Sequence, residues 1–283
     1  MIAVNRSKHS NAASCALFAA ASAGLAGAVY WFAAGTAAGR DVDAYLLRHG
    51  SHGVVERIGE ALVFLVPPTA ALGALALFGT AWRADRRGDA IRAVAIVGGA
   101  AVCARVAKFL LEERDPLGTE TLRRLDPGFF PSGHASAVMA LCLAALFVAP
   151  WPRHRLLIAA GIYASVLGFA IAAGRSHHLS DVLGAFLLAA AVAALGLVGR
   201  TPPGEAVAAA DRLAVARIAM VIAAIIAGIL LLSWHIAREP HYVAGLAATA
   251  GAASALAFLI LVGYERLLRR TECEPSRAIS DAR

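Results

Sequence analysis

Long apolar stretches recur along most of this 283-residue chain, and they restrict it to one class of structure. A hydrocarbon core about 30 Å thick is crossed by a helix of about 20 apolar residues. Hydrophobic residues make up 59% of the chain and charged residues only 16%, more apolar character than a globular core of this length needs. The stretches long enough to span are eight: 12–36, 59–82, 90–112, 132–150, 156–174, 182–199, 215–235 and 243–263. We therefore expect an all-α, polytopic membrane bundle of about eight transmembrane helices.

Basic side chains are concentrated on one of the two sets of loops that these spans define. Loops rich in lysine and arginine stay on the cytoplasmic side of a membrane, and an even number of spans places both termini together. The cations of this set are Arg6, Lys8, Arg83, Arg86, Arg87, Arg153, Arg155, Arg200, Arg212, Arg217, Arg266, Arg269 and Arg270. The opposite loops are 37–58, 113–131, 175–181 and 236–242. Together with the alanine- and arginine-rich composition, this predicts a multi-pass protein of a bacterial inner (plasma) membrane, with both termini cytoplasmic and the opposite loops facing the periplasm or exterior.

The overall charge and the cysteines exclude several other classes of protein. The net charge is +7 and the pI is about 9.7, but the arginines are spread over loops rather than gathered on one folded basic face, so nucleic acid is not an expected partner. The four cysteines have no CxxC spacing and favour neither a disulfide framework nor a zinc site.

The most polar inner connection divides the chain into a larger and a smaller part. It contains Pro202-Pro203-Gly204, which breaks regular structure. We expect a six-helix membrane core at 1–199, a cytoplasmic linker at 200–212, an accessory transmembrane hairpin at 213–264 and a cytoplasmic tail at 265–283.

The segment Pro131-Ser132-Gly133-His134 opens the fourth apolar stretch. Serine is a preferred helix N-cap, and glycine lets a ligand approach backbone N–H groups that have no intrahelical partner. The helix dipole adds partial positive charge at the same point. This pattern is typical of an anion site with His134 in the first turn; the alternative is an ordinary capped helix start with an interfacial histidine.

A second polar group, His177-His178-Leu179-Ser180-Asp181, opens the sixth apolar stretch. Residues four apart share a face of a helix, so Asp181 can accept the proton of one ring nitrogen of His177 and leave the other nitrogen free to attack. The alternatives are histidines at the interface that bind nothing, or a metal site made by His177, His178 and Asp181.

Lys108 lies near the end of the third apolar stretch, where an ammonium group is costly unless it is paired or binds an anionic ligand. The competing interpretation is a lysine whose stem extends to the membrane surface.

The three segments Lys108 to Pro116, Pro131 to His134 and His177 to Asp181 resemble the signature motifs of the type 2 phosphatidic acid phosphatase family, whose superfamily includes the vanadium haloperoxidases. The middle motif matches letter for letter. The resemblance covers roughly 12–199, the six spans typical of the family, and leaves the last two spans unexplained.

Two positions depart from the family pattern. The family has an arginine directly before the proline of the first motif, where this chain has Asp115, with Arg114 one residue earlier. It also has Ser-Arg before the histidine of the third motif, where this chain has Ala170-Ile171. On a continuous helix Arg175 would share a face with Ile171 and supply the missing charge.

The resemblance implies a phosphohistidine mechanism without metal or other cofactor. His177, oriented by Asp181, would attack phosphorus, and His134 would protonate the leaving oxygen and then activate water. The phosphate-binding residues would be Lys108, Arg114, Ser132, Gly133 and Arg175.

The expected partners are the lipid bilayer and a membrane lipid phosphate; the sequence favours no oligomeric state. Candidate substrates are a polyprenyl pyrophosphate, phosphatidic acid or phosphatidylglycerophosphate, and a lipid A-type glycolipid. The alternatives are a catalytically impaired member that binds lipid, a lipid phosphotransferase that uses the same site, and a transporter, which would place charges near the bilayer midplane instead of at helix ends.

Overall fold

The computed structural model describes residues 2–49, 53–111, 130–149, 151–200 and 240–280. Over these residues the chain is entirely helical, without strands, as predicted. The helices are α1 (Ile2–Gly35), α2 (Ala37–His49), α3 (Val54–Arg83), α4 (Arg87–Leu110), α6 (Gly133–Val148), α7 (Arg153–Ala173), α8 (Leu179–Gly196) and α10 (Pro240–Ser280).

Six of these helices are long and apolar enough to cross a membrane. Their apolar segments are Asn11–Gly35, Val54–Arg83, Arg87–Leu110, Arg153–Ala173, Leu179–Gly196 and Ala244–Arg269. The predicted span at 132–150 forms the shorter apolar helix α6, whose 16 residues correspond to a length of about 24 Å. The predicted span at 215–235 and the linker beyond Arg200 lie outside the described residues.

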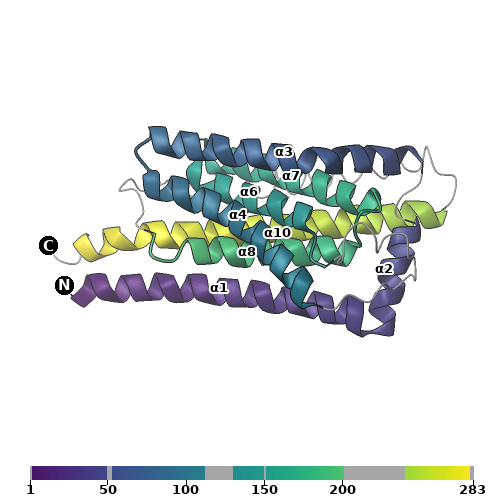
Figure 1. Ribbon diagram of the computed structural model, residues 1–283. Helices are drawn as coiled ribbons and strands as arrows, with labels where there is room; N and C mark the ends of the chain where they lie inside the picture. The colour runs from purple at the N-terminus through teal and green to yellow at the C-terminus, as the bar shows by residue number, and fades with distance from the viewer. Residues whose placement is uncertain (1, 50–52, 112–129, 150, 201–239, 281–283) are drawn as a thin grey trace.

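The helices run side by side, and the shortest of the apolar helices, α6, is central. Its residues Val138, Met139, Ala140 and Leu143 are fully buried, and it packs against α3, α4, α7 and α8. The start of α1 and the end of α10 lie at one end of the bundle, whereas α6 and α8 begin at the other end (Figure 1). The helix starts that carry the sequence motifs are therefore on the end opposite the termini.

Residues 37–49, which were predicted to belong to a loop at 37–58, form helix α2. The hydroxyl of Thr36 accepts the N–H of Gly39 at 3.0 Å and so caps the new helix. Gly39 lies against the preceding turn so closely that a Cβ there would be 2.0 Å from the carbonyl oxygen of Phe32. Because of this tight turn, α2 runs across the end of the bundle where α6 and α8 begin (Figure 1). Its buried face consists of Gly39, Asp43 and Leu47, at intervals of one helical turn.

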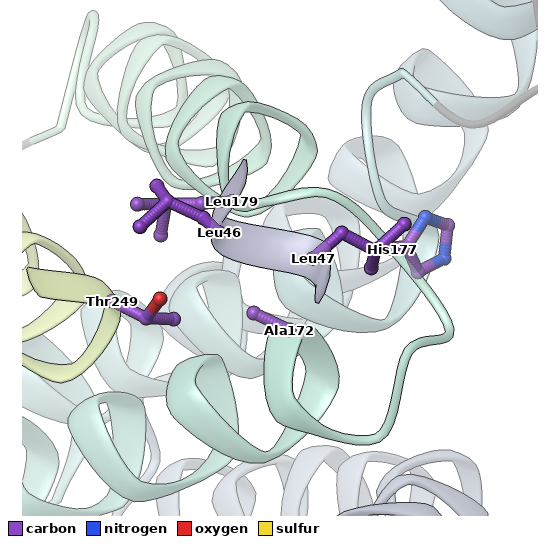
Figure 2. Close-up of a pocket in the computed structure, with 6 residues that line it drawn as sticks. All are labelled: Leu46, Leu47, Ala172, His177, Leu179 and Thr249. Atoms are coloured by element: carbon purple, nitrogen blue, oxygen red, sulfur yellow. The ribbon is translucent and has the colours of Figure 1, made fainter. Parts of the chain in front are cut away.

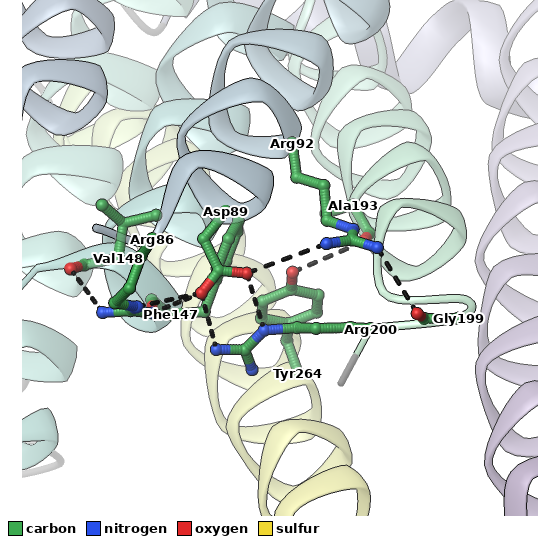
Figure 3. Close-up of polar contacts among 9 residues, drawn as sticks. All are labelled: Arg86, Asp89, Arg92, Phe147, Val148, Ala193, Gly199, Arg200 and Tyr264. Atoms are coloured by element: carbon green, nitrogen blue, oxygen red, sulfur yellow. Dashed lines mark hydrogen bonds and ion pairs between the residues drawn. The ribbon is translucent and has the colours of Figure 1, made fainter. Parts of the chain in front are cut away.

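The opposite end of the bundle is held by a polar cluster around Asp89, in the first turn of α4 (Figure 3). Asp89 accepts hydrogen bonds from Arg86 at 2.6 Å and Arg200 at 3.1 Å, and Arg92 lies 4.0 Å away. Arg86 also donates to the carbonyl oxygen of Phe147, in the last turn of α6, at 2.6 Å. Asp89 and its arginine partners therefore join the start of α4 to the end of α6 and to the segment that follows α8.

Helix α10 packs into the same core as the other helices. Tyr264 is fully buried and donates a hydrogen bond to the carbonyl oxygen of Ala193 on α8 at 3.4 Å. Leu261 and Leu268 are also fully buried and belong to the central apolar cluster.

Candidate active site

The starts of α6 and α8 are joined directly through Ser132. Its backbone N–H donates to the carbonyl oxygen of Asp181 at 3.1 Å. Its hydroxyl oxygen accepts the N–H of Ala135 at 3.3 Å, which confirms the predicted N-cap. Ser132 is fully buried. The two motifs, far apart in sequence, are thus held together at their first helical turns, with His134 in the first turn of α6.

The residue that precedes this motif, Phe130, is packed against a glycine of α8. A Cβ at Gly184 would lie 2.2 Å from the Phe130 ring, so no larger residue fits there. The ring of Tyr30, from α1, lies 5.1 Å from that of Phe130. The segment that enters α6 is therefore positioned by both α1 and α8.

Asp181 contacts two histidines. Its carboxylate lies 3.5 Å from Nδ1 of His177 and 3.5 Å from Nδ1 of His178, and it accepts the backbone N–H of His178 at 2.8 Å. All three residues are buried. The pairing of His177 with Asp181 agrees with the expected proximity, but its cause differs: α8 begins at Leu179 with His178 as N-cap, so His177 precedes the helix instead of sharing one of its faces.

The ring of His177 lies beside the ring of His134. The ring centroids are 6.4 Å apart and the planes are inclined by 59°. A near-attack geometry places reacting atoms about 3–3.5 Å apart. The two rings are neighbours at a distance that allows one small bound group to contact both of them.

A small cavity adjoins His177. Its volume is about 10 Å³, and its walls are formed by Leu46 and Leu47 of α2, Ala172, His177, Leu179 and Thr249 of α10 (Figure 2). This space is about the size of one water molecule. His177 therefore shares this cavity with side chains of α2 and α10.

Lys108 lies in the last turn of α4 and is half-buried. This helix end is on the same side of the bundle as the starts of α6 and α8 (Figure 1), and α4 packs against both helices. Arg114, the other cation of that motif, lies outside the described residues.

The structure does not place Arg175 as the helical argument predicted. Helix α7 ends at Ala173, and Arg175 has a φ of 54°, so it does not share a helix face with Ile171, which is fully buried. Its guanidinium lies 4.0 Å from the carboxylate of Glu56 on α3. Helix α3, which carries Glu56, passes directly beside the end of α7: a Cβ at Gly174 would lie 2.9 Å from the backbone of Gly59.

Asp43 is a residue near the site that the sequence analysis missed. Its carboxylate accepts both the hydroxyl and the backbone N–H of Ser180 in the first turn of α8. Burial raises the pKa of Asp43, and the hydrogen bond from Ser180 and the proximity of His178 oppose that rise. An acid on the buried face of a short amphipathic helix, between Gly39 and Leu47, is the signal that would have revealed it.

Among the residues that the structure describes, no three His, Cys, Asp or Glu side chains are arranged as metal ligands. The alternative set of His177, His178 and Asp181 is not arranged as metal ligands either. Its carboxylate instead contacts the two histidine rings and accepts the backbone N–H of His178 at the start of α8.

Residues 90–201 match the family model described as the PAP2 superfamily. This match supports the resemblance to the type 2 phosphatidic acid phosphatase family that the motifs indicated. The matched segment runs from α4 to the end of α8 and contains Lys108, the α6 start and the histidine–aspartate pair, while α1, α2 and α10 lie outside it. Comparison with curated proteins and with solved structures gives no match. The match to the PAP2 superfamily indicates phosphatase-type activity on phosphate esters.

Proposed function

We propose that this protein is a metal-independent membrane phosphatase that hydrolyses a lipid phosphate or pyrophosphate through a phosphohistidine. The observation that carries the proposal is the position of His134 beside a histidine that a buried carboxylate orients, with ring centroids 6.4 Å apart.

The proposed reaction has two steps. Asp181 lies at Nδ1 of His177, so Nε2 attacks phosphorus, the N–P bond forms, and the P–O bond to the lipid breaks as His134 donates a proton to the leaving oxygen. His134 then removes a proton from water, which attacks phosphorus; the N–P bond breaks and phosphate leaves. The Asp181 carboxylate stabilises the positive charge on the His177 ring in both steps.

The start of α6 is suited to bind the phosphate oxygens. The first N–H groups of a helix lack intrahelical acceptors and lie at the positive end of its dipole. A Cβ added to Gly133 would meet no described atom within 4 Å, so there is space above this backbone. Ser132 and Gly133 would bind the equatorial oxygens there, and Lys108 and Arg114 would supply charge.

Arg175 would bind the substrate phosphate only after its guanidinium leaves Glu56, the carboxylate that it contacts. Its side chain is 44% exposed, and its guanidinium, at 4.0 Å from Glu56, is held loosely. A phosphate carries more charge than a carboxylate, so we propose that Arg175 turns from Glu56 to the substrate when the substrate binds.

The six apolar helices favour a substrate that is itself in the membrane. A polyprenyl pyrophosphate, phosphatidic acid, phosphatidylglycerophosphate or a lipid A-type glycolipid would place its phosphate at headgroup depth, near the ends of membrane helices. With the arginine-rich connections in the cytoplasm, the site would face the periplasm or exterior of a bacterial inner membrane.

A catalytically impaired, lipid-binding family member is the second candidate. It is favoured by the buried Ile171 where the family has an arginine, and by the contact of Arg175 with Glu56. A phosphotransferase would use the same residues and differ only in the acceptor of the phosphoryl group.

The decisive experiment measures phosphate release by detergent-purified protein in EDTA from the candidate lipids, comparing His177→Ala with His178→Ala. Both rings contact Asp181, but His177 is the one beside His134. We expect release that His177→Ala abolishes and His178→Ala retains. Release that survives His177→Ala would contradict the phosphohistidine. If wild-type protein releases no phosphate, a panel of lipid acceptors distinguishes the phosphotransferase from the impaired member.

A further inference from the structure

A second, larger cavity lies between α1, α2 and the start of α8. Its volume is about 360 Å³, within the range of sites that bind small ligands. Its walls are almost entirely apolar. The largest lining side chains are Leu25, Val29 and Phe32 of α1, Val42 and Leu46 of α2, and Leu183 of α8.

This cavity extends from the level of the active site into the depth of the membrane. One end adjoins Leu179 and Ser180 in the first turn of α8. Along α1 it reaches from Ala33 to Leu25, eight residues or about 12 Å of helix. That stretch belongs to the candidate span Asn11–Gly35. An elongated apolar group would match this shape.

Only a thin wall separates this cavity from the catalytic histidine. Leu46 and Leu179 line the large cavity, and they also line the small cavity that adjoins His177 (Figure 2). The two cavities therefore share part of their lining, and His177 belongs to the lining of the smaller one.

The charges at that end determine which part of a lipid can enter. Asp43 and Ser180 are the polar residues of the lining, and they are hydrogen-bonded to each other. A carboxylate repels a phosphate group, whereas it leaves an uncharged hydrocarbon unaffected. The α6 start and Lys108 instead favour the phosphate on the histidine side.

We propose that the α1–α2–α8 cavity binds one hydrocarbon chain of the lipid phosphate substrate and sets the preference for chain length. This inference rests on the proposed phosphatase activity. It assigns substrate selection to α1 and α2, which lie outside the segment that matches the family, while α6 and α8 carry the chemistry.

The test fills the cavity without touching the histidines. Ala28→Trp fills it from α1 and Val42→Trp fills it from α2; both side chains line the cavity and are exposed enough to be enlarged without displacing the core. Ala20→Trp is the matched control, because Ala20 is exposed on the same helix but does not line the cavity.

Each protein is assayed with a short-chain and a long-chain phosphate monoester at one detergent concentration, so that partition into micelles cancels between variants. Single-methylene differences in an apolar pocket change kcat/KM by about 10–200-fold. We expect both cavity variants to lower the long-to-short ratio of kcat/KM by at least about 10-fold. The short ester should be hydrolysed as by wild type, and Ala20→Trp should leave the ratio unchanged.

The outcomes separate this inference from the proposed function. Wild-type protein that hydrolyses neither ester contradicts the phosphatase and the chain site together. An active wild type whose chain-length ratio is the same in all three variants contradicts the chain site alone and identifies the cavity as surface covered by bulk membrane lipid.

Discussion

Asp43 on α2 accepts hydrogen bonds from both the hydroxyl and the backbone N–H of Ser180 on α8. Ser180 is followed directly by Asp181, which contacts His177 and His178. The first N–H groups of α8 have no acceptor within the helix. The Asp43 carboxylate, from another helix, accepts one of them, the N–H of Ser180. A helix outside the family segment thereby stabilises the turn that carries the histidine–aspartate pair.

The stability of the protein should depend on the ionisation of Asp43. Burial raises its pKa in the folded protein, above the value of about 3.9 for an unfolded chain. The stabilising contribution of such a group is complete below its unfolded pKa and is lost as the pH rises through the folded pKa. The free energy of unfolding of wild type, relative to Asp43→Asn, should therefore fall as the pH rises from about 4. Unfolding of both proteins in one detergent across this range measures the difference. A wild type that gains stability over Asp43→Asn with rising pH would show that the carboxylate is instead stabilised as an anion.

Gly184→Ala should impair catalysis through Phe130. The new Cβ would lie 2.2 Å from the Phe130 ring, which is buried and two residues before Ser132, so the entry into α6 must shift. A displacement of about 1 Å in a catalytic geometry reduces rates by about 100-fold, and we expect a loss of this order in kcat. The double variant with Phe130→Leu, which removes part of the ring, should recover activity. If the single variant has the kcat of wild type, the contact of Phe130 with α8 does not position the α6 start.

Arg175 and Glu56 provide a test of the phosphate-binding proposal. If Arg175 leaves Glu56 for the substrate, Arg175→Ala should raise KM, whereas Glu56→Gln should lower KM because it removes the competing carboxylate. A charge-assisted hydrogen bond contributes about 1.5–3 kcal/mol, which corresponds to an increase of about 10-fold or more in KM for Arg175→Ala. Initial rates over a range of substrate concentrations give both constants. An increase in KM for Glu56→Gln would instead mean that Glu56 holds Arg175 in its working position.

The membrane helices and the local start of α6 could be predicted because each depends on neighbouring residues. Hydropathy alone identifies apolar spans, and Ser132 caps α6 through an N–H three residues later in the chain. The pairing of His177 with Asp181 was expected for the same reason, although the turn before α8 produces it instead of a helix face.

The features that the sequence analysis missed depend on contacts between distant segments. Asp43 and Ser180 are 137 residues apart, and no periodicity relates them. Helix α2 is too short and too polar to register as a span, so its charged positions were assigned to a loop. Arg175 was misplaced because the approach of Gly59 to Gly174, which accompanies the end of α7, is likewise a contact between two helices.

Asp89 should be essential for stability but not for the chemistry at the opposite end of the bundle. It accepts hydrogen bonds from Arg86 and Arg200, and the Arg200 side chain is only 1% exposed. Removal of one partner of a buried ion pair leaves an uncompensated charge and costs about 3–5 kcal/mol. We therefore expect Asp89→Ala to lower the free energy of unfolding by about this amount.

Two further variants distinguish the effect of the buried ion pairs on stability from the effect of removing an exposed charge. Asp85→Asn removes a charge that is 91% exposed and lies 3.6 Å from Arg87, keeps a residue that tolerates the φ of 56° at this position, and should change stability by less than about 1 kcal/mol. The double variant of Asp89→Ala with Arg200→Met removes the buried cation as well and should regain part of the loss. Denaturant unfolding of the wild type and the three variants in one detergent measures these differences in stability. Equal stabilities for Asp85→Asn and Asp89→Ala would contradict the role of Asp89, because its contacts with Arg86 and Arg200 would then contribute no more than a solvated surface pair.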